Sequence, residues 1–191
     1  MFTRPGDAIK IQEAIGEALK SDNCTCFIDA FACVGGDTLA AMNQFTGAEI
    51  FSVQVNTGTG RVERLRHNVN MLQDIIPRTG TVQVEAMDIE TFILGLAPRS
   101  DVSVLYLDPP WAMGPDPVTY SNPVVINHHF ERKVWTPLRR KAITPLLIVL
   151  KLPGNPTLPT IEAWPTLLGV QYRRIECLGF RNYAVHILRL V

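Results

Sequence analysis

The sequence predicts an α/β fold with a doubly wound, mostly parallel sheet that ends in an antiparallel C-terminal hairpin. Short apolar runs of strand length alternate with segments whose apolar residues recur every three or four positions, as they do in amphipathic helices. The run DVSVLYLD (101–108) is apolar on both faces, which is typical of a central parallel strand covered by helices. Near the end of the chain, Gly179 and Asn182 separate two strand-like runs, which predicts the hairpin.

The first expected element is a helix over 7–20. Ile11, Ile15 and Leu19 recur there at helical spacing, and Asp7 is a candidate N-cap. The later elements continue the alternation of strands and helices. Strands are expected over 24–31, 48–55, 81–88, 101–108 and 145–152, helices over 37–45, 62–75 and 129–141, a loop rich in Pro, Gly, Ser and Asn over 111–125, and the hairpin over 170–191.

Composition and charge exclude several classes of protein. The 191 residues suit a single domain, with 1–22 as a helical lead-in and 23–191 as the core. Hydrophobic residues make up 47% of the chain, which is enough to build a core and excludes a wholly disordered protein. The 18 basic and 18 acidic side chains cancel, so the chain lacks the basic excess of a protein that coats nucleic acid nonspecifically.

Neither a membrane span, a secretory signal nor a metal site is expected. No stretch of 18 apolar residues occurs, and the N-terminal segment has no apolar signal core, so we expect an intracellular protein of the nucleus or cytoplasm. Cys24, Cys26, Cys33 and Cys177 match neither a zinc module nor a disulfide framework, so we expect reduced thiols and no metal. The sequence leaves the oligomeric state open.

A glycine-containing turn follows the first expected strand. In FIDAFACVGGDT (27–38), Asp29 ends an apolar run, and Gly35 and Gly36 come six and seven residues later. Glycines at such a turn let a ligand approach the backbone closely and leave N–H groups free at the helix start. The spacing is not the GxGxxG dinucleotide fingerprint, and no Gly-Lys-Ser/Thr follows as in a P-loop. A tight turn without a ligand is the alternative interpretation.

The segment LYLDPPWAMGPD (105–116) follows the fourth strand, at the edge where open α/β sheets bind ligands. Pro109 and Pro110 donate no backbone hydrogen bond and keep the chain extended, so the carbonyl between Asp108 and Pro110 can point outward. This carbonyl and the Asp108 carboxylate are two acceptors suited to a planar NH₂ group. Trp111 offers a face on which a base can stack, worth about 1–3 kcal/mol. A rigid turn beside a core Trp is the alternative.

Together the two motifs resemble those of class I S-adenosylmethionine-dependent methyltransferases that act on amines. Those enzymes carry an Asp/Asn/Ser-Pro-Pro-aromatic motif after strand four and a glycine-rich motif after strand one. The VGG after DAF and the Gly-Pro-Asp after Pro-Pro-Trp resemble, more specifically, the RNA-cap guanine-N2 methyltransferases, the trimethylguanosine synthase family. The resemblance implies a Rossmann-like sheet, S-adenosyl-L-methionine as the cofactor, and capped RNA or a cap-like guanine nucleotide as the partner.

Site residues follow from the same resemblance. The catalytic turn that it implies comprises Asp108, Pro109, Pro110 and Trp111, and the implied substrate contacts come from Trp111, which stacks on the 7-methylguanine base, Arg132 and Lys133. The implied cofactor contacts come from Asp29, Phe31, Ala32, Val34, Gly35, Gly36, Thr38, Gln54, Met87 and Asp88.

Three positions carry alternatives or depart from the family pattern. Gln54 stands where the family has an acid that holds the ribose hydroxyls, and an amide makes a bond roughly half as strong. Cys33 stands near a position where the family tends to have a glycine. Its side chain would narrow the end of the pocket that holds the methionine part of the cofactor. Asp88 lies where this class receives the adenine amino group, with Met87 packing near the ring, and its alternative role is to cap the next helix.

A polar cluster follows the Pro-Pro-Trp loop. His128, His129, Arg132 and Lys133 form either a solvated helix face or, with the basic residues of 139–141, a patch that contacts RNA phosphates.

We therefore expect methyl transfer from S-adenosylmethionine to the exocyclic N2 amine of a 7-methylguanosine RNA cap. Positioning of the amine by Asp108 and Pro109 supplies most of the acceleration, and neither a strong general base nor a metal is required. Two alternatives remain. One is another amino-methyltransferase, acting on adenine N6 or an rRNA guanine. The other is a non-catalytic cap- or RNA-binding module on a decayed methyltransferase fold, which Gln54 favours.

Overall fold

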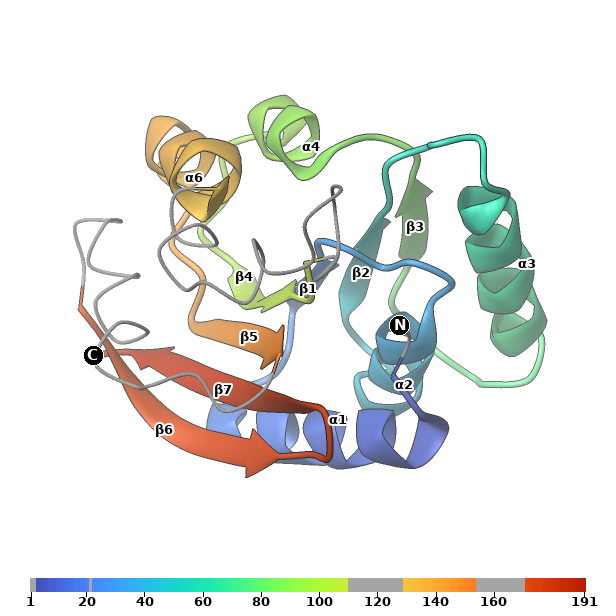
Figure 1. Cartoon of the computed structure of the whole chain (residues 1–191), viewed down its shortest axis with the longest axis horizontal. Helices are drawn as coiled ribbons and strands as arrows, with labels where there is room; N and C mark the ends of the chain where they lie inside the picture. The colour runs from blue at the N-terminus through green and yellow to red at the C-terminus, as the bar shows by residue number, and fades with distance from the viewer. Residues whose placement is uncertain (1–2, 21, 110–128, 154–170) are drawn as a thin grey trace.

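Strands and helices alternate along the chain, as the sequence predicts (Figure 1). The structure is a computed structural model that describes residues 3–20, 22–109, 129–153 and 171–191. Its strands are β1 (Cys26–Asp29), β2 (Glu49–Val53), β3 (Val82–Glu85), β4 (Val102–Leu107), β5 (Leu147–Pro153), β6 (Tyr172–Gly179) and β7 (Tyr183–Leu190). Its helices are α1 (Pro5–Leu19), α2 (Gly36–Gln44), α3 (Arg61–Gln73), α4 (Ile89–Gly95) and α6 (Thr136–Lys141), with a π-helical segment η2 (Glu131–Trp135) directly before α6.

The strands form one sheet in the order β3-β2-β1-β4-β5-β7-β6. Strands β1 to β5 pair in parallel, and β7 runs antiparallel to both β5 and β6. The predicted doubly wound sheet with an antiparallel C-terminal hairpin is therefore confirmed. Because β1, β2 and β4 are neighbours that run parallel, their carboxyl ends lie together at one edge of the sheet, where the strand order reverses.

Helices cover both faces of the sheet (Figure 1). On one face α1, α2 and α3 contribute Ile15, Met42 and Leu65 to the core. On the other face α4 and η2 contribute Phe92 and Trp135. All residues of β1 and β4 are buried, which explains why these strands are apolar on both faces.

The start of α1 differs from the sequence prediction. The helix begins at Pro5 with Arg4 as its N-cap, so Asp7 is not the N-cap. A proline suits the first helical position because it lacks an N–H that would be unpaired there. Asp7 lies in the first turn instead, where its Oδ2 accepts a hydrogen bond from the Tyr183 hydroxyl (2.9 Å). The helix expected over 129–141 is present and contains the π-helical η2.

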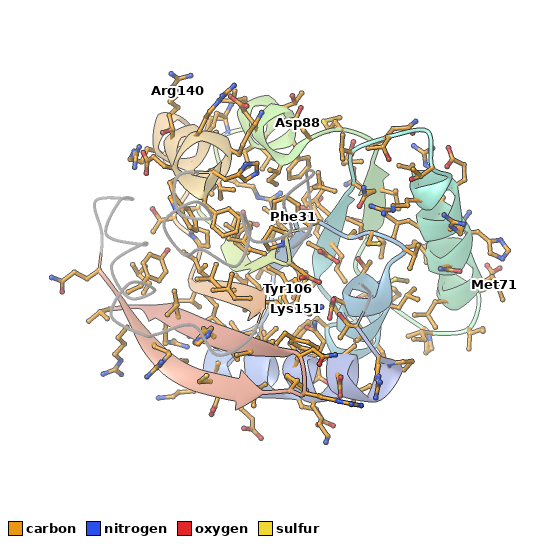
Figure 2. The ribbon with its side chains drawn as sticks, viewed as in Figure 1. Phe31, Met71, Asp88, Tyr106, Arg140 and Lys151 are labelled. Atoms are coloured by element: carbon orange, nitrogen blue, oxygen red, sulfur yellow. The ribbon has the colours of Figure 1, made fainter. Side chains whose placement is uncertain are left out.

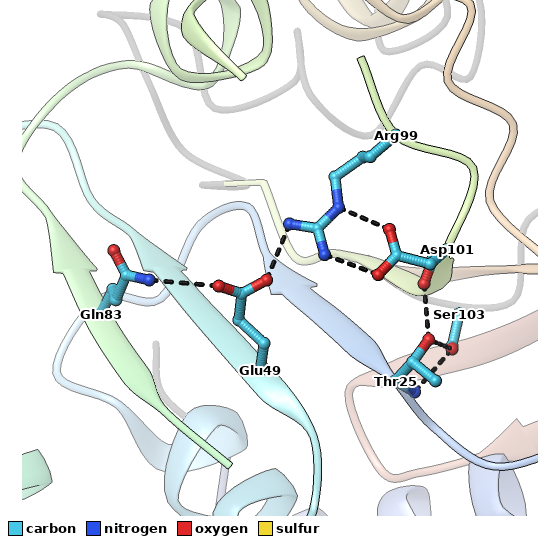
Figure 3. Close-up of polar contacts among 6 residues, drawn as sticks. All are labelled: Thr25, Glu49, Gln83, Arg99, Asp101 and Ser103. Carbon is cyan, nitrogen blue, oxygen red and sulfur yellow. Dashed lines mark hydrogen bonds and ion pairs between the residues drawn. The ribbon is translucent and has the colours of Figure 1, made fainter. Parts of the chain in front are cut away.

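A polar network ties the amino ends of the strands together (Figure 3). Arg99 donates to both carboxylate oxygens of Asp101 (2.7 and 2.8 Å) and to Oε2 of Glu49 (2.7 Å). The Thr25 hydroxyl donates to the Asp101 carbonyl (2.7 Å), and Gln83 donates to Glu49 (3.3 Å). The network thus links β2 and β3 with the residues just before β1 and β4, at the edge of the sheet opposite the carboxyl ends.

All four cysteines are free thiols. Burial raises the pKa of both Cys24 and Cys26 to about 12, so these two thiols stay protonated at neutral pH. Within the described ranges, none of the helices combines the length and the apolar character that a membrane crossing requires.

We expect Arg99→Met to lower the free energy of unfolding by about 1 kcal/mol, because the shared cation of Glu49 and Asp101 is lost while the aliphatic length is kept. Arg66→Met is the matched control, because Arg66 is an exposed arginine on α3. Chemical denaturation of both variants measures the difference. Equal unfolding midpoints for the two variants would show that the network adds no stability.

Candidate functional site at the carboxyl ends of the strands

The turn between β1 and α2 adopts backbone geometry that favours glycine. Gly35, the N-cap of α2, has a φ of +98°, and a Cβ at this position would lie 2.8 Å from Cδ1 of Leu65. Its N–H donates to the Ala32 carbonyl (2.8 Å). Cys33 has a φ of 52°, a left-handed conformation that costs a non-glycine residue about 1–2 kcal/mol. The helix begins at Gly36, one residue earlier than the sequence predicts.

Two side chains brace this turn. Gln54, directly after β2, accepts a hydrogen bond from the Cys33 N–H at Oε1 (2.7 Å) and donates from Nε2 to the Val55 carbonyl (2.9 Å). Asn68 on α3 donates to the Val34 carbonyl (2.9 Å). The sequence predicts that Gln54 faces the cofactor ribose. Both polar atoms of its buried carboxamide bond within the chain, so Gln54 supports the glycine turn, and its contact with the ribose stays a prediction.

Asp29 ends β1 and ties this strand to α2. Its Oδ2 accepts a hydrogen bond from the Thr38 hydroxyl (2.6 Å), which in turn accepts one from Ser52 (2.9 Å). Burial raises the pKa of Asp29 to about 7, and the charges of Asp37 and Asp108 add to this effect. Between pH 4 and pH 7, about the range between its two pKa values, Asp29 keeps its proton in the folded protein but has lost it in the unfolded chain. The free energy of unfolding therefore falls as the pH rises from about 4 to about 7.

Asp108 follows β4 directly and faces a buried lysine on β5. Because Leu107 pairs with Leu150, the next residues of the two parallel strands, Asp108 and Lys151, lie side by side. Nζ of Lys151 lies 2.5 Å from Oδ2 of Asp108 and 3.6 Å from Oδ2 of Asp37. Burial raises the pKa of Asp108 to about 6, although the Lys151 ammonium opposes this shift.

Further contacts surround the lysine. Thr3 donates to Oδ2 of Asp37 (2.5 Å) and accepts a hydrogen bond from Lys151, whose Nζ lies 4.9 Å from the ring centroid of Tyr183. Figure 2 labels both Tyr106 and Lys151 near the centre of the molecule. Burial raises the pKa of Tyr106 above its usual value, and the charge of Asp37 adds to this. We name the four charged residues the buried charge cluster: Asp29, Asp37, Asp108 and Lys151.

Sequence reasoning missed three residues of this site: Thr3, Asp37 and Lys151. A signal for Lys151 was present, because it is the single charged residue in the apolar run 145–152. The contact between Thr3 and Lys151 joins positions 148 residues apart, and no sequence pattern indicates it.

Other predicted cofactor contacts lie around the same edge. Phe31 is half-buried and packs near Phe130, with ring centroids 6.4 Å apart, and Met87 packs against the core. Asp88 accepts hydrogen bonds from the Thr91 N–H (3.1 Å) and hydroxyl (2.9 Å), so its role as the N-cap of α4 is confirmed. Burial alone would raise the pKa of Asp88, but the bonds from Thr91 outweigh it and the pKa is lowered. Its contact with adenine stays a prediction.

The predicted substrate contacts on η2 differ from each other. Arg132 is exposed, whereas Nζ of Lys133 forms an ion pair with Oε2 of Glu90 on α4 (2.6 Å). Arg140 on α6 lies at the outer surface (Figure 2). The solvated helix face and the phosphate-contacting patch both remain compatible with these positions.

Part of the predicted catalytic turn, Pro110 and Trp111, lies outside the described residues, as does His128. Pro109 is buried directly after Asp108. In the part of the chain that the structure describes, no group of His, Cys, Asp or Glu side chains could hold a metal ion. Two carboxyl groups of the buried charge cluster, those of Asp37 and Asp108, lie beside the ammonium of Lys151.

No family model matches this sequence, and no curated protein matches it either. Several solved structures share its fold at low identity. A candidate methylase from Haemophilus influenzae matches with a TM-score of 0.62 and 13% identity, over 94% of this chain and 87% of that chain. A candidate RNA methyltransferase from Pyrococcus horikoshii matches with a TM-score of 0.61 and 16% identity, over 100% and 87%. TYW2 of M. jannaschii, solved in complex with AdoMet, matches with a TM-score of 0.55 and 11% identity, over 100% and 77%. The chain thus has the Rossmann-like fold of these proteins.

We expect Gly35→Ala to lower the free energy of unfolding by about 1–3 kcal/mol, because the new Cβ would sit on a backbone with φ +98° and close to Leu65. Gly6→Ala is the matched control. A Cβ on Gly6 meets no atom within 4 Å, and alanine is favoured over glycine in a helix. Thermal denaturation compares the two variants. A Gly35→Ala protein as stable as the control would show that the turn tolerates a side chain.

Proposed function

We propose that the chain is an S-adenosylmethionine-dependent methyltransferase that methylates an exocyclic amine of a nucleic-acid base. The observation that carries this proposal is the position of Asp108 and Pro109 at the carboxyl end of β4, next to the turn that contains Gly35 and Gly36. Lys151 links the two segments by contacting both Asp108 and Asp37. Open α/β sheets bind ligands at this edge, and the fold shared with methyltransferases supports the proposal.

S-adenosylmethionine fits the groups around the glycine turn. The cofactor carries a sulfonium and an ammonium, and the buried charge cluster holds three carboxyl groups but one ammonium. Oδ1 of Asp37 is buried and has no hydrogen-bond partner among the residues that the structure describes, so it is an acceptor that a cationic donor would satisfy. A Cβ on Gly36 would lie 3.3 Å from the Thr3 carbonyl, so a side chain there would crowd the turn. The residues that would hold the cofactor are those the resemblance implies around this turn, with Met87 and Asp88 near the adenine.

When bound, S-adenosylmethionine supplies an electrophilic methyl group on a positively charged sulfur. Oδ2 of Asp108 is bonded to Lys151, so its other oxygen accepts one amine hydrogen while the Pro109 carbonyl accepts the second. These acceptors favour a pyramidal amine nitrogen, whose lone pair would otherwise be delocalised into the ring. The bound cofactor would supply its methyl group to this nitrogen, with the electron pair of the broken carbon–sulfur bond left on sulfur. The methylated amine then releases a proton to Asp108 or water. Such positioning can contribute about 7–11 kcal/mol.

The substrate we propose is the N2 amine of a 7-methylguanosine RNA cap. Support comes from the sequence resemblance carried by the VGG and Gly-Pro-Asp segments. A 7-methylated guanine carries positive charge, and an indole such as that of Trp111 attracts a desolvated cation by about 2 kcal/mol. The exposed Arg132 on η2 would meet phosphates of the capped RNA.

A second candidate function is cap or RNA binding without methyl transfer. Gln54 favours it, because this position after β2 carries a neutral amide that is engaged with Cys33. Calorimetric titration with S-adenosylhomocysteine separates the two candidates. Saturable heat supports the enzyme, whereas no heat at millimolar ligand supports the binding module.

We expect Asp108→Asn to lower the rate of methyl transfer at least about 100-fold, because one acceptor of the amine becomes a donor. The affinity for S-adenosylhomocysteine should stay within a few-fold of wild type, since the carboxylate is assigned to the substrate. Asp74→Asn is the matched control, because Asp74 is exposed at the end of α3. Transfer of a labelled methyl group to RNA measures the rates. Near wild-type activity of Asp108→Asn would contradict the assigned role.

The cap specificity predicts labelling of 7-methylguanosine-capped RNA but not of RNA with an unmethylated cap or of uncapped RNA. Trp111→Ala should weaken binding of 7-methylguanosine cap dinucleotides much more than binding of S-adenosylhomocysteine, because the cation–π contact is lost. Fluorescence or calorimetric titration measures both affinities. Equal labelling of uncapped RNA would exclude cap specificity and favour methylation of adenine N6 or of an rRNA guanine.

A further inference from the structure

We propose that Lys151 is a positioning residue, whose ammonium holds Asp108 as an oriented carboxylate and thereby sets the lower pH limit of methyl transfer. The inference rests on the proposed function, in which Asp108 accepts a hydrogen from the substrate amine. Its physical part, the control of Asp108 by Lys151, is measurable without any methyl transfer.

Lys151 occupies a buried position on β5 where an apolar side chain would be expected. It is 2% exposed, and its neighbours Leu150 and Leu152 are buried. On the antiparallel side it pairs with Val185 of β7. Removing an ammonium from water costs several kcal/mol unless charged partners compensate. A buried lysine in this strand is therefore tolerated because of the partners that it meets.

These partners lie on different elements. Nζ of Lys151 is bonded to Oδ2 of Asp108 after β4 (2.5 Å), and Asp37 on α2 lies 3.6 Å away. Thr3 accepts a further hydrogen bond from the ammonium, and the ring of Tyr183 lies 4.9 Å from it. A carboxylate held at one oxygen by a buried, multiply bonded ammonium cannot turn freely. Lys151 thus fixes which oxygen of Asp108 is left for a substrate.

The other titratable side chains around Asp108 on the described elements act against its ionisation or are neutral. Asp29 at the end of β1 and Asp37 on α2 add like charges, and Tyr106 of β4 and Tyr183 of β7 have raised pKa values caused mainly by burial. Among the residues that the structure describes, Lys151 is the buried cation that opposes them. A carboxyl group in such surroundings depends on the ammonium to stay charged near neutral pH.

Removing the ammonium should therefore protonate Asp108 at a higher pH. A protonated carboxyl has lost the charge that strengthens its hydrogen bond to the amine, and it can no longer take up the proton released after transfer. In Lys151→Met, the pH below which activity falls should move upward, while the rest of the fold is retained by an apolar side chain of similar length.

The direct test is a titration of ¹³C-labelled aspartate carboxyl groups by NMR, with the Asp108 signal assigned from its absence in Asp108→Asn. We expect the Asp108 midpoint to rise by about one pH unit or more in Lys151→Met, as loss of a close opposite charge implies. It should not move in Lys10→Met, the matched control, because Lys10 is exposed on α1. An unmoved midpoint in Lys151→Met would overturn the inference.

Two further points keep the test decisive. The titration starts at pH 5, where the carboxyl groups that have lost their counter-ion in Lys151→Met can take up protons, so that no unpaired buried charge destabilises the variant. Lys151→Gln serves as a second uncharged variant, whose side chain still donates a hydrogen bond. The pH profile of methyl transfer should move by the same amount as the Asp108 midpoint. If the midpoint moves but the wild type methylates no amine, the proposed function fails and the effect of Lys151 on Asp108 stands. An active enzyme whose profile does not move in either variant would overturn the positioning role.

Discussion

One buried ammonium, that of Lys151, shares a cluster with three carboxyl groups, and this cluster constrains the edge of the sheet where the carboxyl ends of the strands lie. Lys151 on β5 contacts the residue after β4 and the first turn of α2, and Asp29 links α2 back to β1 through Thr38. The Lys151 ammonium and the carboxylates of Asp37 and Asp108 stabilise one another there, because an unpaired buried charge costs several kcal/mol. The strands and the helix that carry the candidate site are therefore held together by electrostatics as well as by the apolar core.

The same constraint explains the chemistry proposed for the site. A carboxylate that only accepts hydrogen bonds from solvent would be a poor anchor for an amine, because water competes for it. In a buried position each hydrogen bond is stronger, and an ammonium at one oxygen leaves the other oriented. The cluster also has more carboxyl groups than cations, which suits a ligand with a sulfonium and an ammonium. The left-handed turn at Cys33 and Gly35, braced by Gln54, places backbone groups beside this charge.

Much of the fold could be predicted from the sequence, because β4 is apolar on both faces and the helices show clear three-to-four-residue spacing. The sequence also located Asp108 and the glycine turn, since both directly follow recognisable strands. Side-chain partners could not be predicted. The pairing of Asp108 with Lys151 depends on the register of strands whose residues lie 43 positions apart. The bond from the Cys33 N–H to Gln54 depends on a backbone angle that a cysteine rarely adopts.

The most direct measurement of the central claim is an amide NMR titration of the ¹⁵N-labelled chain with S-adenosylhomocysteine. We predict saturable binding, with the largest chemical-shift changes at Gly35 and Gly36 and further changes at the residues that follow β2 and β3. Asp101 and Thr25, at the amino edge of the sheet, should not shift. An absence of changes at millimolar ligand, or changes confined to the amino edge, would contradict a cofactor site at the carboxyl ends of the strands.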